Sequence, residues 1–359
     1  MGGKKFVFCG DWVGGKTMGV HRYALQILLE MDRLLETDDR LSLELLVPAD
    51  SHWESPFRSI RVVPLGLRGR EGTTARKILS RLWRQLVFPA YAMLHGGRGV
   101  DLTLAMPSRG LCLCAIHDCI RERFYVEDKS AYQRRYLRRV RRITANDKVR
   151  IVTVSEYSRR EIMELYPVSG PRIRVIGNGW EHMERIHEDE TVLKRLGLAE
   201  GREYFFSLGS KEPHKNMEWV VRTARRNPQY RFVLTGEAFG WEAAREENIL
   251  FTGYLADSEM KALMTHCKAF LQPSFCEGFG IPPLEALSLG RPVICANTSC
   301  LPEIYKDSVR YIDPRAEGCD LEELLSRPVA SPEPILREHS WKNAGERMYA
   351  LLREIDKEG

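Results

Sequence analysis

The stretch PSFCEGFGIPPLE, residues 273–285, joins the end of a strand, a glycine loop and the start of a helix within thirteen residues. Gly278 and Gly280 have no Cβ, so the loop backbone can adopt unusual dihedral angles and approach a ligand closely. Pro282 and Pro283 suit the first turn of a helix, where the backbone amides have no partners within the helix. Free amides at a helix start attract anions, so this stretch predicts an anion-binding site.

Two glutamates flank this loop. Glu277 lies on the loop, and Glu285, eight residues later, lies on the predicted helix. Both carboxylates can accept hydrogen bonds from hydroxyl groups while the loop amides hold an anion. The ligand that this combination implies is a nucleotide sugar.

The Glu-x7-Glu spacing within EGFGIPPLEAL, followed by Gly290-Arg291-Pro292, resembles the retaining glycosyltransferases of family GT4, which have the GT-B fold. Two glutamates at this spacing alone would usually be solvated carboxylates, but the surrounding glycines and prolines argue against that interpretation. Further segments similar to the family are TVSEYS at 153–158, VIGNG at 175–179 and LGSKEPHKN at 208–216. The resemblance covers nearly the whole chain and is stronger in its second half.

The chain has 359 residues, a length that fits two domains. No apolar run approaches the roughly 20 residues that span a bilayer. The start MGGKK leads directly into a strand-like segment instead of a signal-peptide core, so we expect a cytoplasmic protein. Nine cysteines without C-x2-C pairs predict neither a disulfide framework nor a zinc site.

Two series of short apolar segments predict two parallel α/β sheets, because helical or loop segments separate the strands within each series. The predicted strands are 5–9, 41–47, 60–63, 111–116 and 151–154, then 204–209, 232–236, 249–251, 269–271 and 292–294. We therefore expect a Rossmann-like domain over 1–180 and a second over 181–340. The resemblance implies the GT-B arrangement of two doubly wound domains facing a central cleft. It also implies that the first domain binds the acceptor and is completed by a helix within 341–359, while the second binds the nucleotide sugar.

Lys215 is the expected catalytic cation. Cleavage of a glycosyl–phosphate bond builds negative charge on the departing diphosphate, and a cation placed there stabilises it. Lys215 lies in the segment 208–216, which is similar to the phosphate-contacting loop of the family; the alternative is a solvated surface lysine. Many relatives place an arginine earlier in this loop, where this chain has Ser210 and Lys211. Lys211 can supply a second charge but not the bidentate fork of arginine.

The resemblance assigns roles to the residues that surround this loop. Glu285 is expected to hold the ribose hydroxyls. Glu277 is expected to be catalytic and to act at the sugar ring together with the amides of Phe279 and Gly280. Tyr254, after a predicted strand, lies where the family binds the base. The whole donor-binding set also includes Gly278 and Ile281, and in the first half of the chain Gly15 and Gly19.

The first half contributes one further catalytic candidate. His117, in the sequence His117-Asp118 at a predicted strand end, matches a pair found in a subset of these transferases, in which the histidine reaches the donor sugar. Asp118 could orient its imidazole, while a purely structural histidine is the alternative. Gly15 and Gly19 are expected to let the backbone approach the diphosphate or the acceptor; otherwise they are ordinary turn residues.

No D-x-D pair stands in a suitable loop, so we expect transfer without a metal or other cofactor. The resemblance implies retention of the anomeric configuration. In that reaction the leaving phosphate oxygen takes the proton of the acceptor hydroxyl, and no carboxylate acts as base.

Charge is distributed unevenly along the chain. Residues 1–180 have a net charge of +12 and residues 181–359 a net charge of −7, and residues 51–150 contain 21 basic against 8 acidic side chains. This excess predicts an anionic partner for residues 76–142, either a membrane surface or a phosphate-bearing lipid-linked acceptor. Nucleic acid is not expected, because no binding motif accompanies the charge.

The segment 76–88 alternates basic and apolar side chains as a membrane-surface helix does. A core-facing helix with a solvated basic side would give the same pattern. The sequence leaves both interpretations open.

These features predict a sugar-nucleotide-dependent transferase that extends a surface polysaccharide on a lipid carrier, at the inner face of the cytoplasmic membrane. The His117-Asp118 pair and the GVHRY sequence at 19–23 favour mannose from GDP-mannose, while UDP-glucose and UDP-N-acetylglucosamine stay open. Two different functions stay open as well, an epimerase of the same fold and a non-catalytic partner subunit that binds nucleotide or membrane.

Overall fold

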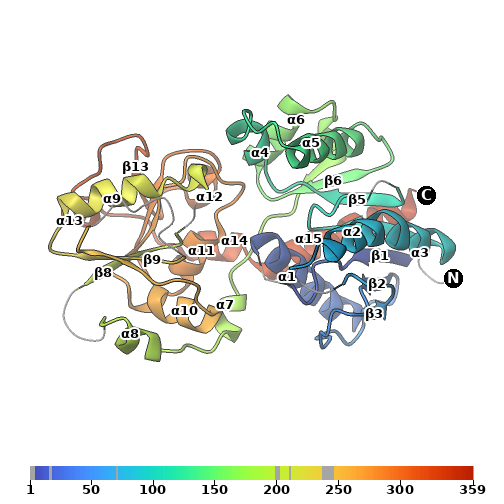
Figure 1. Cartoon of the computed structure of the whole chain (residues 1–359), viewed down its shortest axis with the longest axis horizontal. Coiled ribbons are helices and arrows are strands. Elements are labelled where there is room, and N and C mark those ends of the chain that lie inside the picture. The colour runs from blue at the N-terminus through green and yellow to red at the C-terminus, as the bar shows by residue number, and fades with distance from the viewer. Residues whose placement is uncertain are drawn as a thin grey trace. The chain divides into compact units, whose positions relative to one another are not determined.

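The computed structural model describes residues 5–15, 18–69, 72–107, 109–198, 203–209, 212–236 and 246–358. The chain divides into two compact units (Figure 1). Unit 1 consists of residues 1–178 and 341–359, and unit 2 of residues 179–340. Among the described residues, none of the helices is long and apolar enough to cross a bilayer.

The described residues of unit 1 form a seven-stranded parallel sheet in the order β3-β2-β1-β4-β5-β6-β7. Its strands are β1 (Lys5–Cys9), β2 (Ser42–Val47), β3 (Arg61–Pro64), β4 (Gly97–Asp101), β5 (Leu111–Ala115), β6 (Arg150–Thr153) and β7 (Ile173–Val175). Its helices are α1 (Gly19–Leu35), α2 (Thr74–Leu82), the π-helical turn η1 (Trp83–Val87), α3 (Phe88–Leu94), α4 (Ile120–Phe124), α5 (Ala131–Thr144), α6 (Glu156–Leu165), the 3-10 turn η2 (Gly170–Arg172) and α15 (Trp341–Lys357).

The described residues of unit 2 form a six-stranded parallel sheet in the order β10-β9-β8-β11-β12-β13. Its strands are β8 (Tyr204–Ser207), β9 (Arg231–Leu234), β10 (Ile249–Phe251), β11 (Ala269–Gln272), β12 (Val293–Ala296) and β13 (Arg310–Ile312). Its helices are α7 (His182–Arg185), α8 (Thr191–Arg195), the 3-10 turn η3 (Pro213–Lys215), α9 (Met217–Arg226), α10 (Asp257–His266), α11 (Ile281–Ser288), α12 (Leu301–Tyr305), α13 (Leu321–Ser326) and α14 (Glu333–Glu338).

Both sheets confirm the predicted fold class, two Rossmann-like parallel sheets. In each sheet the chain starts at a central strand, adds strands to one side and then returns to add strands on the other side. The strand order therefore reverses between β1 and β4 in unit 1 and between β8 and β11 in unit 2. Ligands of such sheets bind at the carboxyl ends of the strands beside this switch point. The loops after β8 and β11 are thus the expected place for a ligand in unit 2.

Three strands lie outside the sequence prediction, namely β4, β7 and β13. Strand β4 has the sequence GRGVD, which lacks the usual run of β-branched residues because its neighbours approach too closely for side chains. A Cβ on Gly97 would lie 2.6 Å from Cγ2 of Val7, and a Cβ on Gly99 would lie 2.4 Å from the carbonyl oxygen of Gly110. Strands β7 and β13 have only three residues each.

Helix α15 packs against α1 in unit 1. A Cβ on Gly345 would lie 2.4 Å from Cβ of Glu30, so the two helices touch where α15 has no side chain. The Arg98 guanidinium also donates to the carbonyl of Ile355 at 2.6 Å, which ties β4 to the end of α15. The last segment of the chain thereby completes the unit that contains its first segment.

Candidate active site

Two loops meet at the switch point of unit 2. One follows β8 and contains η3, and the other follows β11 and leads into α11. The Phe275 amide donates to the carbonyl of His214 at 2.7 Å, and the Asn216 side chain donates to the carbonyl of Pro273 at 3.0 Å. Asn216 is buried in the left-handed conformation with φ of 51° and also donates to the carbonyl of Pro314. These bonds join the two loops into one site.

The loop after β8 also requires a glycine. A Cβ on Gly209 would lie 2.0 Å from the carbonyl oxygen of Thr235, and the Gly209 amide donates to the Thr235 hydroxyl at 3.1 Å. Ser210 and Lys211, which follow directly, lie outside the described residues. The identity of the second cation therefore stays a prediction.

Lys215 pairs with Glu277 at this site. Its Nζ lies 2.8 Å from Oε1 of Glu277, and the Gln272 amide donates to the same oxygen at 2.5 Å. Burial by itself would raise the pKa of Glu277, but the charge and hydrogen bond of Lys215, together with Ser274 and His214, hold that pKa below its ordinary value. Glu277 is therefore a buried, ionised acceptor, and Lys215 is a cation held in a fixed place.

The start of α11 has the geometry that its sequence predicts. Gly280 is the N-cap with φ of 80°, and Pro282 stands in the first helical turn. A Cβ on Gly280 would lie 2.9 Å from Cδ2 of Leu301, and the buried hydroxyl of Tyr305 donates to the Gly280 carbonyl. The Glu277 amide donates to the Ser299 hydroxyl at 3.0 Å. Helix α12 and the segment before it therefore hold the glycine loop in place through contacts with Gly280 and Glu277.

Glu285 has a partner that the sequence did not indicate. Nε2 of His182, the first residue of α7, lies 2.7 Å from Oε1 of Glu285, and both side chains are buried. His182 and Tyr305 are two of the residues that sequence reasoning missed. The nearest sequence signal was the Asn178-Gly179 landmark just before His182, which says nothing about Glu285, 103 residues further on.

Tyr254 follows β10, next to the point where the loop after β9 pairs with the loop after β10. Gly236 and Gly253 exchange backbone hydrogen bonds of 2.8 and 3.1 Å, and Gly253 has φ of 71°. Tyr254 is 86% exposed, so its ring makes little packing contact with the described residues of this unit. Residues 237–245, which follow Gly236, lie outside the described part of the chain.

His117 is at the carboxyl end of β5 in unit 1. Its Nε2 lies 2.9 Å from the Leu102 carbonyl, and its ring makes an edge contact with Tyr23 at 4.7 Å between centroids. Burial lowers the pKa of His117, although the Leu102 carbonyl and the nearby Asp118 and Asp101 oppose this shift. The imidazole is therefore neutral at pH 7.

The expected role of Asp118 is wrong. Asp118 accepts from the Ile120 amide at 3.0 Å and so holds the start of α4, while the Leu102 carbonyl contacts the imidazole. A carboxylate two residues before a helix amide is well placed to satisfy that amide, which otherwise has no partner within the helix.

The two N-terminal glycines differ in their surroundings. A Cβ on Gly15 would lie 3.3 Å from the Trp12 carbonyl, whereas a Cβ on Gly19, at the start of α1, would meet nothing within 4 Å. Packing within the described residues therefore does not require glycine at position 19. The glycine that this turn requires is Gly14, with φ of 72° and a Cβ position 2.1 Å from the Ser51 carbonyl.

Apart from Tyr254, which follows the edge strand β10, the predicted site residues in the described part of the chain fall into two groups. Lys215, Glu277, Glu285 and the segment 278–281 share the switch point of unit 2. His117 follows β5 of unit 1, and Gly15 and Gly19 follow β1 of the same sheet.

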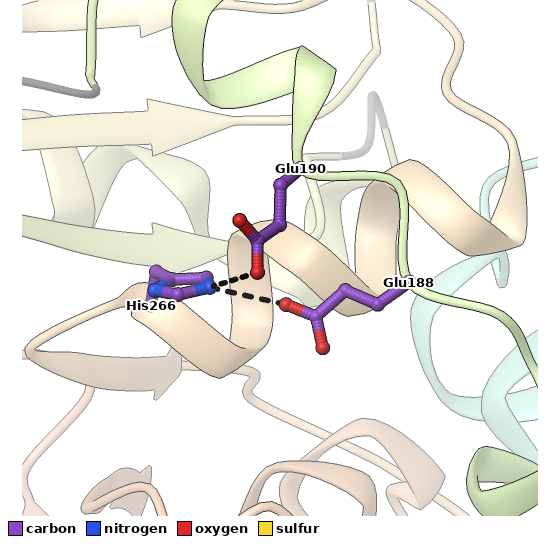
Figure 2. Close-up of side chains that lie close together, drawn as sticks. All are labelled: Glu188, Glu190 and His266. Atoms are coloured by element: carbon purple, nitrogen blue, oxygen red, sulfur yellow. Dashed lines mark hydrogen bonds and ion pairs between the residues drawn. The ribbon is translucent and has the colours of Figure 1, made fainter.

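A separate cluster of Glu188, Glu190 and His266 lies elsewhere in unit 2 (Figure 2). Nε2 of His266 is 3.1 Å from Glu188 and 3.6 Å from Glu190, and its side chain is 42% exposed. His266 ends α10 just before β11, so the cluster is at the amino end of the strand whose carboxyl end leads to Glu277. Ion pairing and the helix C-terminus both favour a histidine here.

Comparison with known proteins gives the family. Residues 44–182 match the family described as "Glycosyltransferase Family 4", and residues 188–347 match "Glycosyl transferases group 1". Together these two matches cover 44–182 and 188–347, and the chain belongs to the glycosyltransferases that the two family models describe. The family resemblance of the sequence is thereby confirmed.

Several curated relatives are mannosyltransferases. The chain is 31% identical over 210 residues to O-antigen chain mannosyltransferase B of Escherichia coli, covering 54% of this chain and 52% of that protein. It is 24% identical to O-antigen chain mannosyltransferase RfbU of Salmonella typhimurium, covering 54% and 55%. It is 27% identical to serotype-specific mannosyltransferase WbdA of Escherichia coli, covering 55% and 26%. The matches thus span about half, or about a quarter, of these relatives' lengths.

Solved structures confirm the GT-B fold. The glycosyltransferase WaaG, involved in lipopolysaccharide biosynthesis, has a TM-score of 0.66 at 16% identity, covering 95% of this chain and 94% of that chain. Sucrose-phosphate synthase of Thermosynechococcus elongatus has a TM-score of 0.74 at 16% identity, covering 99% and 100%.

Lys215→Ala is expected to lower turnover of the nucleotide sugar about 100- to 1000-fold, because one fixed charge contact to the leaving group supplies roughly that factor. Lys268→Ala is the matched control, since Lys268 also pairs with a glutamate in unit 2 but precedes β11. Initial rates and melting curves of both variants test this. Near-normal turnover in Lys215→Ala would remove Lys215 from the mechanism.

The loss of stability in Lys215→Ala is expected to depend on pH. Glu277 has a lowered pKa in the folded protein, so the pair stabilises above the ordinary carboxyl pKa and loses that effect as pH falls through the lowered one. The difference in melting temperature between wild type and Lys215→Ala should therefore shrink under acid conditions. A difference that stays constant with pH would contradict the ion pair.

Proposed function

We propose that this protein is a retaining, metal-independent hexosyltransferase that transfers mannose from GDP-mannose to a lipid-linked glycan in surface-polysaccharide synthesis. The observation that supports this most is the Lys215–Glu277 pair beside the first turn of α11, at the switch point of the sheet in unit 2. Family membership supports the class of reaction. The names of the curated relatives support mannose and an O-antigen-like product.

In this proposal the diphosphate binds the Lys215 ammonium and the backbone N–H groups of Gly280 and Ile281 at the start of α11, since Pro282 and Pro283 have none. Glu285 accepts hydrogen bonds from the ribose hydroxyls, and Glu277, whose lowered pKa keeps it ionised, accepts from hydroxyls of the hexose. The exposed Tyr254 lies near the base. Lys215, Glu277 and Glu285 are each held in place by a partner among the described residues.

The bond between the anomeric carbon and the diphosphate oxygen breaks, and the acceptor oxygen forms a bond to the same face of that carbon. The acceptor hydroxyl gives its proton to the departing phosphate oxygen. Lys215 and the amides of Gly280 and Ile281 stabilise the charge on the diphosphate. Neutral His117 gives its single N–H, at Nε2, to the Leu102 carbonyl, so its Nδ1 can accept a hydrogen bond from a hydroxyl of the donor sugar. No metal and no protein base takes part in this scheme.

Unit 1 supports the lipid side of the proposal. Helix α2 contains no buried residue, and Ile78, Leu82 and Leu86 are 56%, 45% and 60% exposed at a spacing of four. The π-helical turn η1 has more residues per turn than an α-helix, which rotates Leu86 back toward the line of the other two. The result is an apolar stripe open to solvent.

For the segment 76–88, the interpretation as a core-facing helix holds only for residues 83–88. Trp83 and Phe88 are buried in the core of unit 1, and the Trp83 indole donates to the Leu65 carbonyl. Residues 74–82 include no buried side chain of this kind. The segment therefore packs on the core of unit 1 through η1 and α3, while the side chains of α2 are exposed.

Arginines of two helices gather beside this stripe. The pKa of Arg139 on α5 is lowered by its burial and by the positive charges of Arg84, Arg81 and Arg135. The positive charges of Arg81 and Arg84 thus act on Arg139, so α5 and the α2–η1 segment contribute to one basic region. An apolar stripe next to clustered arginines suits a bilayer with anionic headgroups. We therefore propose peripheral binding at the inner face of the cytoplasmic membrane.

A panel of nucleotide sugars with a lipid-linked glycan acceptor tests the reaction. We expect release of GDP from GDP-mannose only when acceptor is present, with an α-linked product if configuration is retained. Release of UDP from UDP-glucose or UDP-N-acetylglucosamine instead would show that the donor is a UDP-sugar and not GDP-mannose. Isomerisation without acceptor would identify an epimerase, and binding without turnover a non-catalytic subunit; either would contradict the proposal.

Co-sedimentation with vesicles tests the membrane surface. The protein is expected to bind phosphatidylglycerol-containing vesicles and to dissociate as salt rises, because headgroup attraction is screened. The double variant Leu82→Asp with Leu86→Asp should bind much more weakly, while Val329→Asp, an exposed apolar position in unit 2, should bind like wild type. Absence of binding, or binding that does not change with salt, would contradict the membrane surface and show that this region is an ordinary solvated surface.

A further inference from the structure

The buried pair of His182 and Glu285 is not explained by the proposed transfer alone. Glu285 stands four residues after Ile281, the first residue of α11, so its Cα lies about 6 Å along the helix axis from the helix start where the diphosphate is proposed to bind. That separation suits the ribose of a nucleotide whose diphosphate lies at the helix start. A carboxylate that binds two neighbouring hydroxyls must also be held in one orientation, because both bonds depend on the plane of the group.

His182 provides that orientation from another helix. Its Nε2 lies 2.7 Å from Oε1 of Glu285, and the side chains of His182 and Glu285 are 5% and 10% exposed. Since a carboxylate only accepts hydrogen bonds, Nε2 must bear the proton that is shared. A buried carboxylate with a charged or strongly polar donor this close has little freedom to rotate.

Helix α7 is short, but neighbouring elements hold it firmly. The Lys261 ammonium on α10 donates to the carbonyls of Met183 and Ile186 at 2.8 and 2.9 Å, which satisfies two groups at the end of α7. The Trp180 indole, two residues before His182, donates to the Leu336 carbonyl at 2.9 Å. These hydrogen bonds therefore hold the backbone around His182 in a fixed position within unit 2.

We infer that His182 is a positioning residue, which holds the Glu285 carboxylate in the orientation that receives the ribose hydroxyls of the donor. This inference rests on the proposed function, because it assumes that a nucleotide binds at α11. His182 itself touches no part of the substrate. Its effect on the reaction passes through Glu285 and concerns recognition of the ribose.

The competing explanation is a structural pair that fastens α7 to α11. Such a pair would contribute to stability, and its loss would affect every ligand of the site in the same proportion. A positioning role predicts something narrower. Loss of His182 should weaken only ligands that have ribose hydroxyls.

Calorimetric titration with GDP and with 2′,3′-dideoxy-GDP separates these explanations, and UDP with its dideoxy form serves if the base is uracil. Wild type is expected to bind the ribonucleotide about 10- to 100-fold more tightly, as hydrogen bonds to a charged group imply. His182→Ala should lose most of this preference while its affinity for the dideoxy nucleotide stays unchanged. His182→Gln, which retains an N–H donor, should restore part of the preference.

His266→Ala is the matched control, because His266 also pairs with a glutamate in unit 2 but lies at the amino end of β11 (Figure 2). Its preference for the ribonucleotide should equal that of wild type. If melting curves show His182→Ala to be unfolded, His182→Leu, which fills more of the buried space, takes its place.

Two results would overturn the inference. A His182 variant that keeps the full ribonucleotide preference, or that loses affinity for both nucleotides equally, shows a structural pair. Wild type that binds nucleotide without any preference for ribose shows that Glu285 does not meet the ribose. Failure of the assumption that a nucleotide binds at α11 looks different, because wild type would then bind neither nucleotide. The acceptor-dependent turnover assay tests the reaction separately.

Discussion

The ion pair of Lys215 and Glu277 is the interaction on which the site depends. It joins two loops that follow neighbouring strands of one sheet, and it brings a fixed cation to the start of α11, where the helix amides already favour an anion. Glu277 is buried, so its ionised form needs the positive charge of Lys215. Without ligand, the carboxylate balances the lysine. A diphosphate at the helix start would present the lysine with a second anion in the same place.

The surrounding residues keep this pair in position by satisfying the backbone of both loops. Asn216 bonds to two carbonyls from different segments, and Gly209 permits a contact with Thr235 that no side chain would allow. Behind α11, Tyr305 holds the carbonyl of Gly280, and His182 holds the side chain of Glu285. The site therefore consists of fixed donors, acceptors and charges, which is the arrangement that stabilises developing charge without reorganisation.

Much of the fold could be predicted from the sequence because parallel strands buried on both faces read as short apolar runs. The strands that escaped prediction have few residues or, like β4, need glycine where neighbours approach closely. Glu277, Gly280 and Lys215 could be proposed as site residues because each stands in a local motif, at 273–285 or at 208–216. His182 and Tyr305 could not, since each acts on a residue that only the folded chain brings near. The role expected of Asp118 failed because a helix amide two residues later competes for its carboxylate.

A crystal structure of the protein with GDP-mannose or its nucleotide diphosphate tests this mechanism most directly. We expect the diphosphate to lie within hydrogen-bonding distance of Nζ of Lys215 and of the amides at the start of α11, with the ribose hydroxyls on Glu285. A nucleotide bound in the crystal without contact to residues 273–285 would contradict it.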